Sequence, residues 1–149
     1  MRQKDIYFMP LGGAQSVGRS CYYLRLGQSN ILLDCGLQRI NGATCSPDFR
    51  SLLTSQFMES MQQLDHVYIS HAHTDHVGYL PQLMQMAPQA SVYMTLQTKQ
   101  LAEYRLIANS SQQGADEASR LLSSVAPVNY LQKIKQRDYT VTFFPAGHI

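Results

Sequence analysis

Hydrophobic and polar residues alternate in short blocks over the first third of the chain, and this pattern predicts β-strands. Mostly apolar runs occupy residues 6–9, 21–26 and 31–33. The first run stops at Pro10, where we expect its strand to end, and short glycine-containing segments separate the runs. Three such runs joined by short turns are typical of an antiparallel meander.

From residue 65 onward, strand-like runs alternate with segments of helical periodicity, which predicts a sheet covered by helices and an α+β fold. Strands are expected over 67–70, 91–94 and 139–144. Helices are expected over 49–61, through 77–80 up to Pro88, over 96–108, and briefly around 121–122 after a polar break at 112–114. Residues 37–48, which include Asn41-Gly42 and Pro47, are expected to form a loop.

The composition changes this picture in one respect. Hydrophobic residues make up 44% of the 149 residues and charged residues only 15%, below the usual quarter for a domain of this size. Low surface charge indicates that part of the surface is covered by more protein. The formal net charge of +2 is too small to argue by itself for nucleic acid or an anionic membrane.

The cysteines and the amino terminus predict the compartment. Cys21, Cys35 and Cys45 are odd in number and lack CxxC spacing, which favours a reducing, intracellular setting with Cys21 and Cys35 as buried strand residues. The first residues do not resemble a signal peptide, and no apolar run is long enough to cross a bilayer. We therefore expect a soluble cytoplasmic protein without a membrane partner.

Potential metal ligands are concentrated in the segment HAHTDHVG at residues 71–78, directly after the apolar run that ends at Ser70. Residues two apart on an extended segment point the same way, so His71 and His73 can approach one ion together, whereas Asp75 and His76 face a neighbouring position. Imidazole and carboxylate ligands suit zinc, with manganese or iron as competitors. The spacing predicts two metal sites. The competing interpretation is a polar loop in which Thr74 or Asp75 caps a helix.

Two further residues end apolar strands. Asp34 follows Ile31–Leu33, where it either caps a turn through Gly36 or orients a ligand histidine. His148 follows a Pro-Ala-Gly turn and is a candidate third ligand beside His71 and His73, which gives a three-histidine zinc site with an open position. His66 begins its strand rather than ending it, so we leave it out of the site.

These motifs resemble the metallo-β-lactamase superfamily, whose hallmark HxHxDH is matched by His71, His73, Asp75 and His76. Asp34 in ILLDCG and His148 in PAGHI match its flanking motifs. LGGAQSVGRSCYYL at 11–24 and SHAHTDHVGYLP at 70–81 resemble the β-CASP group, RNA-cleaving enzymes that include ribonuclease J and the cleavage and polyadenylation endonuclease.

The resemblance implies an αββα sandwich of which residues 1–149 form the first half, with the β-CASP domain and the carboxyl-terminal part of the fold absent. It implies two zinc ions in the intact enzyme, Asp75 and Asp34 as catalytic residues, and RNA as the substrate. Family members continue to a metal-bridging aspartate and a further histidine, so we expect the 149 residues alone to be inactive.

Two other functions stay open: a small-molecule hydrolase of the same fold, such as a thioesterase or lactonase, and a non-catalytic interaction module. A half-sandwich also leaves an apolar sheet face without its partner, so we expect the chain to self-associate. The residues expected on that face are Ile6, Phe8, Ile31, Leu33, Val67, Ile69 and Val92.

Overall fold

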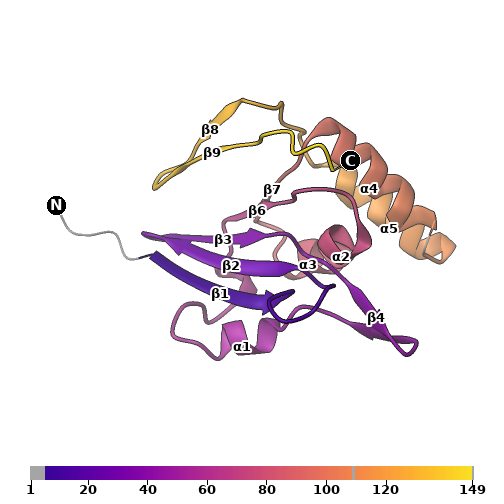
Figure 1. Ribbon diagram of the computed structural model, residues 1–149, viewed down its shortest axis with the longest axis horizontal. Coiled ribbons are helices and arrows are strands. Elements are labelled where there is room, and N and C mark those ends of the chain that lie inside the picture. Colours follow the sequence, from indigo (N-terminus) through magenta and orange to yellow (C-terminus); the bar gives the residue numbers. More distant parts are fainter. Residues whose placement is uncertain (1–5, 109, 149) are drawn as a thin grey trace.

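The computed structural model describes residues 6–108 and 110–148, and its centre is a five-stranded mixed sheet (Figure 1). In spatial order the strands are β1 (Ile6–Gly12), β2 (Cys21–Leu26), β3 (Ser29–Leu33), β6 (His66–Tyr68) and β7 (Ser91–Tyr93). The first three pair antiparallel, whereas β6 and β7 continue the sheet parallel to β3. The predicted mixed sheet with an amino-terminal antiparallel meander is confirmed.

Helices and two small hairpins surround this sheet. The helices are α1 (Phe49–Leu53), α2 (Thr74–Val77), α3 (Leu80–Met86), α4 (Leu96–Ala108) and α5 (Gln112–Ser123). The hairpins β4 (Gln38–Ile40) with β5 (Ala43–Cys45), and β8 (Lys133–Lys135) with β9 (Thr140–Thr142), form separate two-stranded sheets. Figure 1 shows α4 and α5 as a pair and the β8–β9 hairpin across the sheet from α1. The predicted α+β class is confirmed.

The core lies on the helix-covered face of the sheet. Tyr23, Leu32 and Val67 are at most 1% exposed there, and they belong to one apolar cluster with Leu52 of α1 and Leu83 of α3. Burying a side chain of this size contributes roughly 1.5–3 kcal/mol, so this cluster is what fixes the helices to the sheet. The same packing holds the ends of β3 and β6 rigidly side by side.

The opposite face is only partly covered. Tyr68 lies against Tyr139 and Phe143 of the β8–β9 segment, with ring centroids 6.3 Å apart in both pairs. At the far edge, Ile6 is 68% exposed and Phe8 is 59% exposed. This second face is therefore apolar and open at its β1 side.

The prediction that seven named residues share one inner face is wrong. The register pairs Phe8 with Leu24 and Leu24 with Ile31, so these side chains share the open face. Val67 pairs with Leu32 and Val92, which places it on the helix-covered face instead. A shift of one residue in register exchanges the two faces, and the apolar runs do not reveal that register.

Several predicted boundaries also need correction. Strand β1 continues through Pro10, which pairs with Tyr22 just before a register shift. A missing N–H is tolerated there because β1 is an edge strand. The expected loop at 37–48 contains the β4–β5 hairpin, since Asn41 and Gly42 both adopt positive φ, 49° and 81°, as a type I′ turn needs.

The helix expected over 49–61 is much shorter, because the Thr54 and Ser55 hydroxyls donate to the Arg50 and Leu52 carbonyls where α1 ends. A separate 3₁₀ turn follows at Met61–Gln63. Residues 112–114 are not a break but the first turn of α5, where the Ser111 hydroxyl accepts from the Gly114 N–H. The sequence analysis did not predict β8.

The expectation for the cysteines is partly confirmed, since Cys21 lies in β2 whereas Cys35 follows the end of β3 and is not a strand residue. Cys21 and Cys35 are fully buried, and all three cysteines of the described chain are free thiols. Within residues 6–108 and 110–148, no helix combines the length and the apolar character that crossing a bilayer requires.

Candidate metal centre

The candidate site lies at the carboxyl ends of the two adjacent parallel strands β3 and β6. Backbone bonds from Asp34 N–H to Tyr68 O (2.9 Å) and from Ile69 N–H to Tyr93 O (2.9 Å) carry the strand pairing up to the site. The chain then leaves β6 through Ser70 and enters α2 at Thr74. His73 is the N-cap residue and makes no side-chain capping bond, so neither Thr74 nor Asp75 has the capping position that the competing interpretation gave it.

Backbone contacts fix the loop that carries the histidines. The carbonyls of Thr74, Asp75 and His76 accept from Leu37, Ser20 and Cys35 at 2.7–2.9 Å. Gly36 lies directly against the Asp75 carbonyl, and any side chain at that position would overlap it. The loop is thus held by main-chain bonds to the residue that precedes β2 and to the segment that follows β3, independently of any ligand.

The structure brings His71, His73 and His148 together, as the sequence analysis predicts. One ring nitrogen from each lies within 4.8 Å of the others. His71 Nε2 is 3.1 Å from His73 Nδ1, and His148 Nε2 is 3.3 Å from the same atom. Zinc–nitrogen bonds of 2.0–2.1 Å in a tetrahedron place ligand nitrogens about 3.3–3.4 Å apart. The three imidazole donors and the two separations from His73 fit a zinc-sized ion, and the third pair of nitrogens lies within 4.8 Å.

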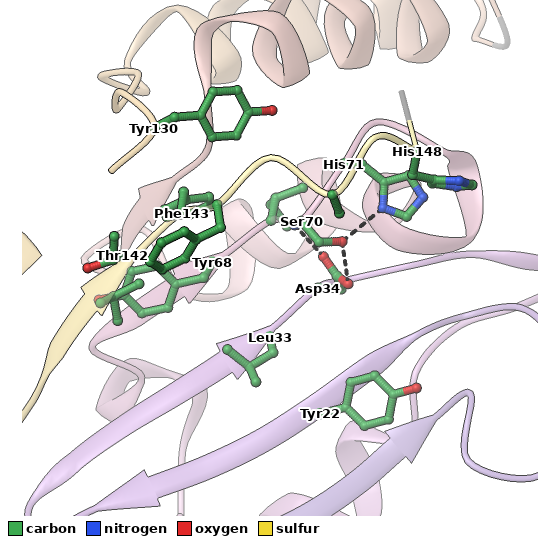
Figure 2. A pocket seen from close by; sticks show the side chains of 14 residues that line it. Tyr22, Leu33, Asp34, Tyr68, Ser70, His71, Tyr130, Thr142, Phe143 and His148 are labelled. Carbon is green, nitrogen blue, oxygen red and sulfur yellow. Dashed lines mark hydrogen bonds between the residues drawn. The ribbon is translucent and has the colours of Figure 1, made fainter. Parts of the chain in front are cut away.

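Asp34 and Ser70 determine which nitrogen of His71 is available. The Ser70 hydroxyl donates to Asp34 Oδ2 at 2.8 Å, and Ser70 Oγ is 2.9 Å from His71 Nδ1 (Figure 2). Since the single hydroxyl proton goes to the carboxylate, Ser70 Oγ accepts from His71 Nδ1–H. The lone pair of His71 is then on Nε2, the atom that faces His73. Burial is the main cause that lowers the pKa of His71, which keeps the ring neutral and able to ligate.

The backbone of Asp34 adopts a positive φ angle, which is uncommon for a residue other than glycine. Its φ is 61°, in the left-handed region that aspartate enters more readily than most residues. Its carboxylate accepts from Ser70 N–H at 2.7 Å as well as from the Ser70 hydroxyl, and the side chain is nearly buried. Asp34 therefore lies under the loop that carries the histidines and accepts hydrogen bonds from it.

Asp75 and His76 lie beside the three-histidine cluster rather than within it. His76 Nδ1 is 2.8 Å from Asp34 Oδ2, and this hydrogen bond is the main cause that raises the pKa of His76. The bond leaves His76 Nε2 exposed to a ligand, 3.6 Å from Asp75 Oδ2. Since the His71 and His76 ring centroids are 4.0 Å apart, a second ligand pair stands next to the first cluster.

A cleft of about 590 Å³ opens beside this cluster (Figure 2). Asp34, Ser70, His71 and His148 line its polar end. Tyr22, Leu33, Tyr68, Tyr130, Phe143 and Phe144 line its apolar walls. The arrangement therefore offers a ligand a candidate metal site at one end of the cleft and aromatic side chains along its walls.

The sequence analysis missed Ser70 and the aromatic wall of the cleft. Ser70 is a polar residue at the end of the apolar run before His71, which was the available signal. Tyr130, Phe143 and Phe144 come from the β8–β9 segment, and their approach to β6 depends on tertiary packing. His66, which the sequence analysis left out, lies against Tyr139 rather than in the cluster.

Fold and site together define the metallo-β-lactamase class of protein. Residues 29–149 match the beta-lactamase superfamily domain, and the chain belongs to this superfamily, which implies a divalent metal at the histidine cluster. A metallo-β-lactamase from Cronobacter sakazakii shares the fold, with a TM-score of 0.61 at 18% identity over 97% of this chain and 52% of that one.

Two curated relatives are more similar to this chain in sequence than that structure is. The Integrator complex subunit 11 homolog of Dictyostelium discoideum is 34% identical over 157 residues, covering 97% of this chain and 21% of the relative. The Probable RNase MJ4 of Methanocaldococcus jannaschii is 31% identical over 147 residues, covering 93% of this chain and 32% of the relative. The chain thus spans a third or less of the length of these relatives, and its similarity to a probable RNase agrees with the predicted resemblance.

Proposed function

We propose that this chain is the metal-binding part of a metal-dependent hydrolase that cleaves RNA phosphodiester bonds. The observation that carries this proposal is the cluster of His71, His73 and His148. His73 Nδ1 lies at near-tetrahedral spacing from a ring nitrogen of each of the other two, and Ser70 sets the tautomer of His71. Zinc is the proposed metal, because three imidazole nitrogens leave one open position, as in catalytic zinc sites.

His71, His73 and His148 would hold a divalent metal, which would supply Lewis acidity there and lower the pKa of a coordinated water to about 7. The chain's own residues prepare the site. Asp34 acts through Ser70 and His76, so we assign it a positioning role rather than direct chemistry. Asp75 carries a carboxylate that is 34% exposed beside His76, where its Oδ2 can accept the proton that an attacking water releases.

RNA is the proposed substrate for two reasons. The relatives include a probable RNase that matches nearly the whole of this chain. The aromatic side chains that line the cleft also include Tyr130 and Phe144, which are 41% and 69% exposed. Aromatic faces stack on unpaired bases and contribute roughly 1–3 kcal/mol per base. A phosphodiester at the histidines can therefore have its neighbouring bases on these rings.

We further propose that Asp75 and His76 bind a second ion only with ligands supplied beyond residue 149. The resemblance to the family implies that a bridging carboxylate and a further histidine complete such a second site. The 149-residue chain alone is then expected to bind one ion firmly and to cleave RNA poorly or not at all. A cytoplasmic location is proposed on the three free cysteines.

Zinc binding tests the site directly. Equilibrium dialysis of the 149-residue chain is expected to give about one firmly bound zinc, lost in His71→Ala and retained in the surface variant Glu117→Ala. A chain that binds no zinc would remove the proposed function.

A segment exchange tests the substrate. The chain replaces the matching segment of the M. jannaschii probable RNase, and the chimera is expected to cleave single-stranded RNA in a metal-dependent manner. The same chimera with His71→Ala is the control. A folded chimera that hydrolyses thioesters or lactones but leaves RNA intact would favour the small-molecule hydrolase instead.

A further inference from the structure

Away from the histidine cluster, a second group of polar side chains joins the sheet to the β8–β9 hairpin. Tyr139 OH lies 2.7 Å from His66 Nδ1 and 2.9 Å from Tyr68 OH. Gln136 Nε2 donates to Tyr68 OH at 3.3 Å and to Tyr93 OH at 3.0 Å. We call these five residues the Tyr139 network. It brings together residues from β6, β7 and the hairpin, all on the open face of the sheet.

The protons of the network have one consistent direction. Gln136 donates both amide protons, so Tyr68 accepts one and donates its own proton to Tyr139. Tyr139 then donates to His66 Nδ1, which requires a neutral His66 with its proton on Nε2. Burial favours these neutral forms, since it is the main cause that lowers the pKa of His66 and raises the pKa of Tyr139.

The position of the hairpin depends on such side-chain contacts. Strands β8 and β9 pair with each other in a sheet of their own, not with the central sheet. The contacts that join them to the central sheet include the Tyr139 network, the Phe143–Tyr68 ring contact and the bonds from Gln28 N–H and Ser29 to Asp138 Oδ2. The Tyr139 hydroxyl bridges two side chains of β6, His66 and Tyr68.

The hairpin carries the segment that delivers His148. Strand β9 ends at Thr142, and the chain then passes through Gly147, in a left-handed conformation (φ 70°), to the cluster. His71 and His73 are fixed from the other side by the main-chain bonds of their own loop. A shift of β9 on the sheet therefore moves His148 while His71 and His73 stay in place.

We infer that Tyr139 is a positioning residue for His148: its hydroxyl fixes the β8–β9 hairpin on β6 and so completes the three-histidine cluster. This inference rests on the proposed metal site. It predicts that the contribution of Tyr139 to metal affinity is made through His148 and disappears when that ligand is removed.

The first test is a double-mutant cycle on zinc affinity, measured by competition with a chromophoric chelator. Tyr139→Phe keeps the ring and removes the hydroxyl, and it is expected to weaken zinc binding about tenfold, at the low end for groups that orient ligands. In a His148→Ala background the same change is expected to have no further effect. Tyr104→Phe on α4, where Tyr104 is 72% exposed, is the matched control.

A pair of His66 variants separates the hydrogen bond from packing. The Asn side chain presents an oxygen close to the position of His Nδ1, so His66→Asn is expected to retain zinc affinity, whereas His66→Phe is expected to lose it as Tyr139→Phe does. Equal zinc affinity in wild type and Tyr139→Phe would overturn the inference. So would an equal loss in the presence and absence of His148.

A second readout does not need metal. The His71 and His148 ring centroids are 4.8 Å apart, close enough for a nuclear Overhauser effect between their ring protons. In metal-free protein we expect this signal in wild type and Tyr104→Phe and its loss in Tyr139→Phe. Persistence of the signal in Tyr139→Phe would overturn the inference, whether or not the wild type binds zinc. A wild type that binds no zinc would instead remove the proposed function.

Discussion

Ser70 makes two hydrogen bonds to Asp34, from its backbone N–H at 2.7 Å to Oδ1 and from its hydroxyl at 2.8 Å to Oδ2. The first bond fixes the path of the chain as it leaves β6, and the second orients the hydroxyl. Because these two bonds have separate consequences, the geometry of the loop and the tautomer of His71 can be perturbed independently.

Ser70→Ala removes the hydroxyl and leaves the backbone bond in place. His71 Nδ1 then loses its partner, so its Nε2 lone pair is no longer favoured over the alternative tautomer. We expect zinc affinity to fall about tenfold, with the thermal midpoint of the metal-free chain nearly unchanged. Ser123→Ala on α5 is the control, and an unchanged zinc affinity in Ser70→Ala would show that Ser70 does not orient His71.

Asp34→Ala removes the acceptor for both Ser70 and His76. Because Asp34→Ala affects the histidines of both proposed metal positions, we expect it to lower zinc affinity more than Ser70→Ala does. Zinc affinity should fall by about 10–100-fold, the usual cost of losing a group that orients ligands. Competition with a chelator measures it, and Asp116→Ala on the exposed side of α5 is the control. A loss smaller than that of Ser70→Ala would contradict this order.

The pH dependence of folding should report His66. Its pKa is lowered from the model-compound value of 6.5, mainly by burial and against the opposing charge of Asp65. The other titratable groups facing it are Tyr68, Tyr93 and Tyr139. A histidine with a lowered pKa in the folded state contributes stability that is present above pH 6.5 and is lost as pH falls through its folded pKa.

Urea unfolding of the metal-free chain at pH 8, 6.5 and 5 tests this prediction. Wild type should lose more stability on acidification than His66→Asn, which cannot be protonated. The comparison cancels the other histidines, because both proteins contain them. Parallel losses in the two proteins would show that His66 does not govern this transition.

The site was more predictable from the sequence than its surroundings. His71, His73 and Asp75 follow one apolar strand, so local spacing alone indicates metal chemistry. Asp34 and His148 follow other strands, and the common edge of a sheet is what brings strand ends together. The faces of the sheet could not be predicted in this way, because Phe8 and Val67 look equivalent in sequence and the register alone separates them.

The hydrogen-bond network between side chains could not be predicted from the sequence either. The Tyr139 network joins residues 66 and 139, and its bonds exist only because β9 lies over β6. The predicted length of α1 was wrong for a local reason. The Thr54 and Ser55 hydroxyls compete for the carbonyls that would continue the helix.

The open face of the sheet leads to the last prediction, that the 149-residue chain self-associates. Phe8 stacks on Tyr22 with ring centroids 5.8 Å apart, and Ile6, on the same strand, is 68% exposed. Contiguous apolar surface of this kind is rarely left open on a monomer, and the cost of keeping it in water falls when two copies cover it.

We expect light scattering of the wild-type chain to show dimers or larger species at micromolar concentration. Ile6→Thr with Phe8→Ser should shift the population toward monomer, because these changes remove apolar area without touching the core. Tyr104→Ser is the matched control, since Tyr104 is also exposed but lies on α4. If wild type is a monomer, the open face does not drive association; if the control dissociates the oligomer equally well, a different surface does.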